Sequence, residues 1–334
     1  MTDIARADGP VAVPPAASGE PVAVRSAADV VGSVVENLQR AVRAPRDTLE
    51  LCVLCLLAEG HLIIEDFPGV GKTVLAKSIA RSLHLSFSRL QFTPDLLPTD
   101  VTGVNVFNQR TSEFEFRPGP VFANVLLVDE INRASPKTQS ALLEAMQETQ
   151  VTIDGVTYPL DQPFFVIATQ NPIEYEGTYP LPEAQLDRFT ARLSLGYPPF
   201  REEARMLAEQ TTAPPLDHLG AVADRDNLVG AIEAARGVFV EESVGDYVVG
   251  ITRHTRDSAL LALGASPRAG IALLRMAKAR AAAGARDYVL PEDVQAVAGA
   301  VLSHRVILAP EARASGMRGE DAVERALAEV PIPK

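Results

Sequence analysis

The chain reads IIEDFPGVGKT at residues 63–73, where an apolar run ends in a glycine turn and Lys72-Thr73 open a helical pattern. A strand, a glycine turn and a helix N-terminus together make a cradle for phosphate, because backbone N–H groups at the helix start point at the anion. The lysine reaches the outer phosphates, and the threonine hydroxyl can bind Mg²⁺. This stretch predicts a nucleotide site; the alternative is a strand–helix turn that contains Gly-Lys-Thr by chance.

One position departs from the phosphate-loop pattern G-x-x-x-x-G-K-[ST]. Counting back from Gly71, Asp66 stands where the pattern has its first glycine. A carboxylate aimed at a phosphate would be repelled. We therefore expect the Asp66 side chain to turn outward, and a glycine in its place to be tolerated.

Composition is that of a soluble globular protein: 334 residues, of which 47% are hydrophobic and 22% charged. The formal charge of −12 disfavours electrostatic binding of nucleic acid over a broad surface, but it does not exclude binding through a local basic groove. No apolar run approaches the ~20 residues that a membrane-spanning helix needs, and residues 1–25 lack the apolar core of a signal peptide. We expect a cytoplasmic protein.

The cysteines, Cys52 and Cys55, form a C-x-x-C pattern inside an apolar stretch. No second Cys or His pair follows at metal-ligand spacing, so a zinc site is not supported. We interpret them as small apolar residues on a buried helix; a redox role is the alternative.

The order of patterns predicts two domains after a disordered tail at residues 1–25. Strand and helix patterns alternate over residues 26–198, which indicates an α/β fold with a parallel sheet flanked by helices. A proline-rich boundary follows, and helical patterns dominate residues 199–334, which predicts a smaller all-α domain. Two irregular segments interrupt the α/β part: a long connection at residues 93–120 and a hairpin at residues 150–160.

Polar residues stand where buried strands end. An apolar run leads directly to Asp129-Glu130, and Asn171 follows the next buried strand. Ligands of open α/β sheets bind at the carboxyl ends of the strands. Arg188 closes a short helical segment, and Arg268 lies in the first turn of a helix that begins with Ser-Pro. Each feature alone is ordinary, but their order after the phosphate loop favours an ATPase.

Five longer stretches make a resemblance specific. They are DEINRA (129–134), SALLEAMQE (140–148), ATQNP (168–172), EAQLDRF (183–189) and ASPRA (265–269). In them the chain resembles the MoxR family of AAA+ ATPases, over about residues 30–310. The resemblance implies a P-loop NTPase core followed by a helical lid, with the two irregular segments facing the centre of a ring.

Residue roles follow from this resemblance. It implies nucleotide contacts from Pro68, Gly69, Val70, Gly71, Lys72, Thr73, Val74 and Asp129. Lys72 would hold the outer phosphates of ATP, and Thr73 with Asp129 would bind Mg²⁺. Glu130 would polarise the attacking water, and Asn171 would orient it.

The arginines would complete the site. The resemblance implies that Arg188 is a finger inserted into a neighbouring subunit's site, and that Arg268 is a second sensor on the lid. Arg133 is a further candidate for contact across the interface, and the sequence does not rank it against Arg188.

The same resemblance implies a homo-oligomer, typically a hexameric ring, that acts on a protein partner by chaperone-like remodelling, metal insertion or assembly. That partner is often a protein with a von Willebrand factor A domain. Two alternatives stay open: a magnesium-chelatase-like motor subunit, and a regulatory scaffold with little hydrolysis. A nucleic-acid motor is disfavoured by the net charge.

Overall fold

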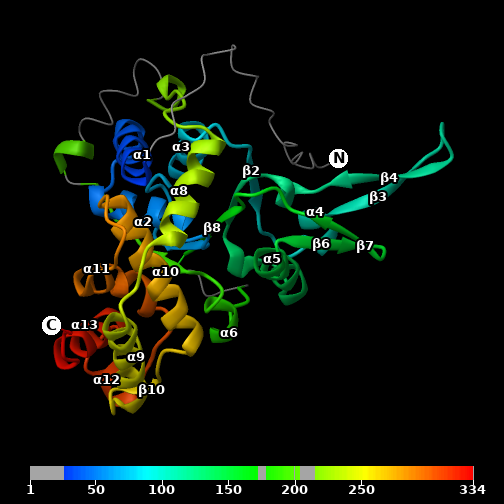
Figure 1. The fold of residues 1–334 in the computed structure, drawn as a ribbon. Coiled ribbons are helices and arrows are strands. Elements are labelled where there is room, and N and C mark those ends of the chain that lie inside the picture. The colour runs from blue at the N-terminus through cyan, green and yellow to red at the C-terminus, as the bar shows by residue number, and fades with distance from the viewer. Residues whose placement is uncertain (1–25, 172–177, 199, 204–214, 334) are drawn as a thin grey trace.

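The computed structural model describes residues 26–171, 178–198, 200–203 and 215–333 (Figure 1). A five-stranded sheet with the order β2-β5-β8-β1-β9 forms the centre of the first part. Its strands are β1 (Leu62–Glu65), β2 (Phe87–Gln91), β5 (Val125–Asp129), β8 (Phe165–Gln170) and β9 (Ala191–Leu193). All neighbouring pairs are parallel, so the carboxyl ends share one edge. The predicted α/β class is confirmed.

Both faces of the sheet are buried at its centre, because alternate residues of β1, β5 and β8 supply different cores. On β5, Val125 and Leu127 face one core, and Leu126 and Val128 face the other. Helices α1 (Ala27–Ala41), α2 (Arg46–Leu57) and α3 (Lys72–Ser82) cover the first face, and α5 (Pro136–Glu148) covers the second. A strand buried on both faces reads as a continuous apolar run, which is why β5 is visible in the sequence.

Both cysteines lie on α2 and are completely buried. Burial raises the pKa of the Cys52 thiol to about 12, and it raises the pKa of Cys55 as well. A protonated thiol is inert, so the interpretation of these cysteines as apolar core residues agrees with the structure. No group of three or more His, Cys, Asp or Glu in the described ranges could hold a metal.

The two irregular segments form one arm beside the sheet. The first contains a short helix that was not predicted, α4 (Pro98–Thr102), and the hairpin β3 (Gly103–Asn108) and β4 (Glu113–Pro118). The second is the hairpin β6 (Gln150–Ile153) and β7 (Val156–Pro159). Phe116 stacks on Tyr158 with ring centroids 4.2 Å apart, and Asn105 Nδ2 donates to Asp154 Oδ2 at 2.7 Å. The arm extends away from the body of the molecule (Figure 1).

The second part of the chain is mainly helical. Its helices are α8 (Arg225–Gly237), α9 (Glu242–Asp257), α10 (Pro267–Ala283), α11 (Pro291–Leu302), α12 (Pro310–Ala314) and α13 (Gly319–Glu329). A two-stranded sheet of β10 (Leu261–Leu263) and β11 (Ile307–Leu308) was not predicted. The predicted tail and residues 204–214 of the predicted helical domain fall outside the described residues. No helix that the structure describes is long and apolar enough to cross a membrane.

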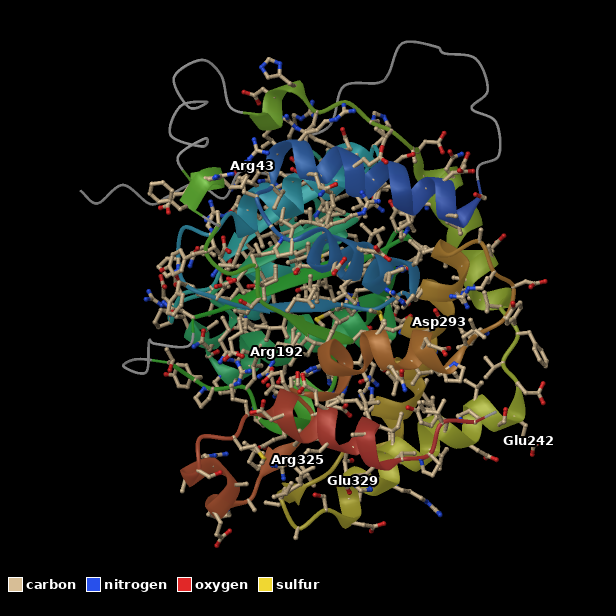
Figure 2. The ribbon with its side chains drawn as sticks, turned by 90° about the vertical axis from the view of Figure 1, so that its left-hand side faces the viewer. Arg43, Arg192, Glu242, Asp293, Arg325 and Glu329 are labelled. Atoms are coloured by element: carbon tan, nitrogen blue, oxygen red, sulfur yellow. The ribbon has the colours of Figure 1, made fainter. Side chains whose placement is uncertain are left out.

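An arginine of the sheet pairs with both the sheet and this helical part. Arg192 of β9 contacts Glu65 of β1 and Glu320 of α13, each at 3.0 Å, and Figure 2 labels it above the red helix α13. The lid therefore packs on the strand that forms one edge of the sheet.

Candidate nucleotide site

The phosphate loop connects β1 to α3. Gly69 and Gly71 have φ values of +86° and +93°, which L-residues with a side chain rarely adopt. Gly71 is also the N-cap of α3, and no side chain caps the helix there. The first N–H groups of α3 are therefore presented to an anion by the backbone alone.

A hollow of about 350 Å³ lies at the carboxyl edge of the sheet. It is lined by Pro68, Gly69, Gly71, Lys72, Thr73, Val74, Arg89, Gln91, Asp129, Glu130, Thr169 and Asn171. Of the nucleotide contacts named from the sequence, all except Val70 line it. The hollow also contains residues that sequence reasoning missed: Arg89, Gln91 and Thr169.

Lys72 folds back over the loop. Its Nζ donates to the backbone oxygens of Asp66 at 2.8 Å and Phe67 at 3.0 Å. Partial burial lowers the pKa of Lys72, and the carboxylates of Asp66, Asp129 and Glu130 act in the opposite direction. These contacts hold the ammonium group inside the turn where phosphate oxygens would bind.

The expectation for Asp66 was wrong. Its side chain does not turn outward but is 4% exposed, and its Oδ2 accepts from the backbone N–H of Leu195 at 2.6 Å and Gly196 at 2.9 Å. The Ser194 hydroxyl donates to the same oxygen at 3.1 Å, and Oδ1 accepts from Phe67 N–H at 3.1 Å. The carboxylate avoids the phosphate cradle by turning inward, and it ties the start of the loop to the chain that leaves β9. Since backbone N–H donors surround it, a glycine would leave them without an acceptor.

Asp129 ends β5 between two neighbouring strands. Arg89 of β2 donates through Nε to Asp129 Oδ2 at 2.7 Å, and the Thr169 hydroxyl of β8 donates to Oδ1 at 3.2 Å. Thr73 lines the same hollow. Carboxylate and hydroxyl oxygens are hard donors that suit Mg²⁺, so this donor set fits the ion that the resemblance implies.

Glu130 follows in the left-handed conformation, with φ +57°. Its backbone N–H donates to Thr169 Oγ1 at 3.0 Å, and its Oε2 lies 2.8 Å from Arg133 Nε. Asn171, which follows β8, lines the same hollow. Glu130 and Asn171 thus both line the hollow beside the phosphate cradle.

The predicted arginines lie elsewhere. Arg188 follows α6 (Glu183–Leu186), donates to the Leu143 backbone oxygen at 2.8 Å, and lines a separate hollow of about 200 Å³. Arg268 is exposed in the first turn of α10, which Ser266 caps. Neither arginine lines the nucleotide hollow of its own chain.

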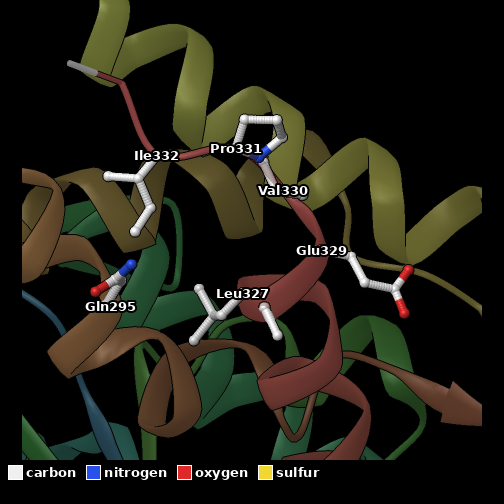
Figure 3. A pocket seen from close by; sticks show the side chains of 7 residues that line it. Gln295, Leu327, Glu329, Val330, Pro331 and Ile332 are labelled. Atoms are coloured by element: carbon white, nitrogen blue, oxygen red, sulfur yellow. The ribbon is translucent and has the colours of Figure 1, made fainter.

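A larger hollow of about 610 Å³ lies at the C-terminal end of the lid (Figure 3). It is lined by Gln295, Leu327, Ala328, Glu329, Val330, Pro331 and Ile332. Its lining is mainly apolar and includes no cationic side chain that could bind phosphate.

The chain is similar to AAA-type ATPases in sequence and in structure. Residues 61–191 match the model of the ATPase family associated with various cellular activities (AAA), and residues 253–326 match an AAA lid domain. Uncharacterized protein YeaC of Bacillus subtilis is 48% identical, over 91% of this chain and 95% of its own length. Chaperone MoxR1 of Mycobacterium tuberculosis is 42% identical, over 89% of this chain and 81% of its own length. A solved structure of a candidate ATPase from Cytophaga hutchinsonii superposes with a TM-score of 0.86 at 39% identity, covering 92% of this chain and 96% of that one.

Proposed function

Because this chain belongs to the MoxR family of AAA+ ATPases, we propose that it binds ATP with Mg²⁺ and hydrolyses it to remodel a protein partner. One observation carries the proposal. Lys72 and Thr73 at the start of α3, Asp129 and Glu130 at the end of β5, and Asn171 after β8 all line one hollow beside a glycine-rich turn. Phosphoryl transfer depends mainly on positioning and electrostatic stabilisation, which such a convergence supplies.

In this proposal each side chain has one task. Lys72 holds the β- and γ-phosphates, and Thr73 and Asp129 supply oxygen ligands for Mg²⁺, which neutralises phosphate charge when it is bound. The carboxylate of Glu130 accepts the proton of the attacking water, and the Asn171 amide orients that water. The Thr169 hydroxyl, which contacts both Asp129 and the Glu130 backbone, holds the two acids in register.

We infer that the active form is a ring, in which Arg188 enters the neighbouring subunit's site. Two observations support this: Arg188 lies outside its own hollow, and the adjacent Asp187 pairs with Arg305 instead of with Arg188. Arg133 already contacts Glu130 of its own chain, which favours Arg188 as the trans arginine. Arg268, on the lid, is the candidate second sensor.

We further propose a protein client, such as one with a von Willebrand factor A domain. The arm exposes a cross-strand aromatic pair, Phe107 and Phe114, which are 49% and 72% exposed with ring centroids 5.3 Å apart. Exposed aromatic side chains suit a protein contact, whereas the net charge of −12 disfavours nucleic acid. In this account residues 26–198 are the ATPase core and residues 199–334 the lid.

The test separates binding from turnover. Glu130→Gln keeps the phosphate and Mg²⁺ ligands, so we expect nucleotide affinity near wild type and turnover lowered by roughly 10²–10⁴-fold. Lys72→Ala removes a phosphate ligand, so affinity itself falls. Lys137 is an exposed lysine on α5. Lys137→Ala is the control and should leave nucleotide affinity and turnover unchanged. Turnover near wild type in Glu130→Gln would remove Glu130 from the mechanism.

A further inference from the structure

Arg305 is a buried arginine whose contacts reach across from the lid to the ATPase core. It follows α11 and is 8% exposed. Its Nε donates to Asp187 Oδ1 at 2.7 Å, and its other nitrogens donate to the backbone oxygens of Asp187 at 3.1 Å, Phe189 at 2.7 Å and Thr190 at 2.9 Å. The neighbouring His304 Nε2 lies 3.0 Å from the same Phe189 oxygen. The lid thus holds residues 187–190, the segment that carries Arg188.

The second oxygen of Asp187 turns back to the lid. Ser266 donates through Oγ to Asp187 Oδ2 at 3.2 Å, and the same Oγ accepts from the Ala269 N–H as the N-cap of α10. Arg268 lies in the helical turn that this cap begins. One carboxylate therefore joins the segment of Arg188 to the helix start of Arg268.

Stability alone does not account for this arrangement. Desolvation lowers the pKa of Arg305, which the hydrogen bond and charge of Asp187 oppose. Buried ion pairs are often no better for stability than well-packed apolar side chains, because the desolvation cost offsets the attraction. The hydrogen bonds of Arg305 instead fix the position of the backbone at residues 187–190.

We propose that Arg305 and Asp187 are positioning residues that set the location of Arg188 from the lid, so that the two functional arginines move as one unit. The inference rests on the proposed function, in which Arg188 acts in the neighbouring site. Neither positioning residue lines the nucleotide hollow, so their loss affects turnover and not nucleotide binding.

The test compares Arg305→Lys, which keeps the charge but loses the fork of donors, with Asp187→Asn. We expect kcat to fall roughly 10- to 100-fold, because a misplacement of about 1 Å costs on this order. ATP affinity stays within about two-fold of wild type, because transition-state contacts alone are lost. Arg286→Lys is the matched control: Arg286 makes a bidentate pair with buried Asp293 within the lid, with both distances 2.6 Å. Arg286→Lys should lower the free energy of unfolding about as much as Arg305→Lys does, and it should leave kcat unchanged.

Ser266 provides a second pair of variants in case the buried pair is needed for folding. Ser266→Ala removes one bond to Asp187 and should lower kcat several-fold, while Ser266→Thr restores the hydroxyl and the activity. In mixed rings, Lys72→Ala subunits should rescue Asp187→Asn subunits, because they supply a correctly placed Arg188.

The outcomes separate the two proposals. If Arg188→Ala keeps wild-type turnover, the trans role of Arg188 is wrong. If Arg188→Ala is inactive while folded Arg305→Lys, Asp187→Asn and Ser266→Ala keep wild-type kcat, only the positioning inference is overturned. An equal loss of kcat in Arg286→Lys would also overturn it, since that loss would reflect general destabilisation of the lid.

Discussion

Replacing Asp66 tests whether this residue is a defective phosphate-loop glycine or a structural acceptor. In the structure Asp66 accepts two backbone N–H groups of the chain beyond β9, of which the Leu195 bond is buried and the Gly196 bond partly buried. Leaving a buried donor without a partner costs about 1–3 kcal/mol. Asp66→Ala should therefore lower the free energy of unfolding by about 3 kcal/mol, taking both donors together.

Other substitutions of Asp66 should differ in how much they lower the free energy of unfolding. Asp66→Asn keeps one carbonyl acceptor and should cost about 1–2 kcal/mol, because its amide group then faces the Phe67 N–H. Asp66→Gly should be at least as damaging as Asp66→Ala, since it loses the same bonds and adds roughly 0.5–1 kcal/mol of backbone freedom in the unfolded chain. Asp66 is not among the residues with positive φ, so its backbone gains nothing from glycine.

Urea unfolding followed by far-UV circular dichroism measures these differences, because the chain has no tryptophan to report by fluorescence. A loss of about 3 kcal/mol corresponds to roughly 6–12 °C in Tm for a unit of this size. Asp246→Ala, at an exposed site on α9, is the control and should stay within about 0.5 kcal/mol of wild type. Unchanged stability and raised turnover in Asp66→Gly would refute the structural account.

Three further predictions follow from other parts of the molecule. Arg188→Ala and Lys72→Ala rings should each be nearly inactive, yet mixing them should restore part of the activity, because an intact Arg188 then meets an intact phosphate loop; no recovery in rings shown to exchange subunits would contradict a trans role. Burial lowers the pKa of His61 from 6.5 to about 4, so the unfolded chain binds a proton that the folded chain excludes. His61 alone should lower the free energy of unfolding by about 2 kcal/mol between pH 7 and pH 5. Burial also lowers the pKa of His304, so part of the pH dependence should remain in His61→Gln, and the fall in that variant should be about 2 kcal/mol smaller than in the wild type. Phe107→Ser with Phe114→Ser should keep basal ATPase activity and Tm but abolish client-dependent stimulation, and stimulation that survives would place the client contact elsewhere.

Much of the fold was predictable because it depends on local patterns. The phosphate loop joins a strand to a helix within a few residues, so its glycines and Lys72-Thr73 are visible in sequence order. The strand of Asp129 is buried on both faces and therefore reads as a continuous apolar run. The predicted nucleotide contacts, apart from Val70, line one hollow. The small β10–β11 sheet was missed because its strands are short and partly exposed, which leaves little apolar pattern.

Local sequence patterns thus identify the residues around the phosphate loop, whereas the partners of those residues depend on how distant segments pack together. Arg89 meets Asp129 because β2 lies beside β5, and sequence order does not reveal which strands are neighbours. Asp66 looked like a substituted glycine, since the N–H groups that hold it lie about 130 residues later in the chain. Arg305 and Asp187 are likewise brought together only when the lid packs on the core. A buried charge takes its role from the groups that surround it, and for these residues the groups come from distant parts of the chain.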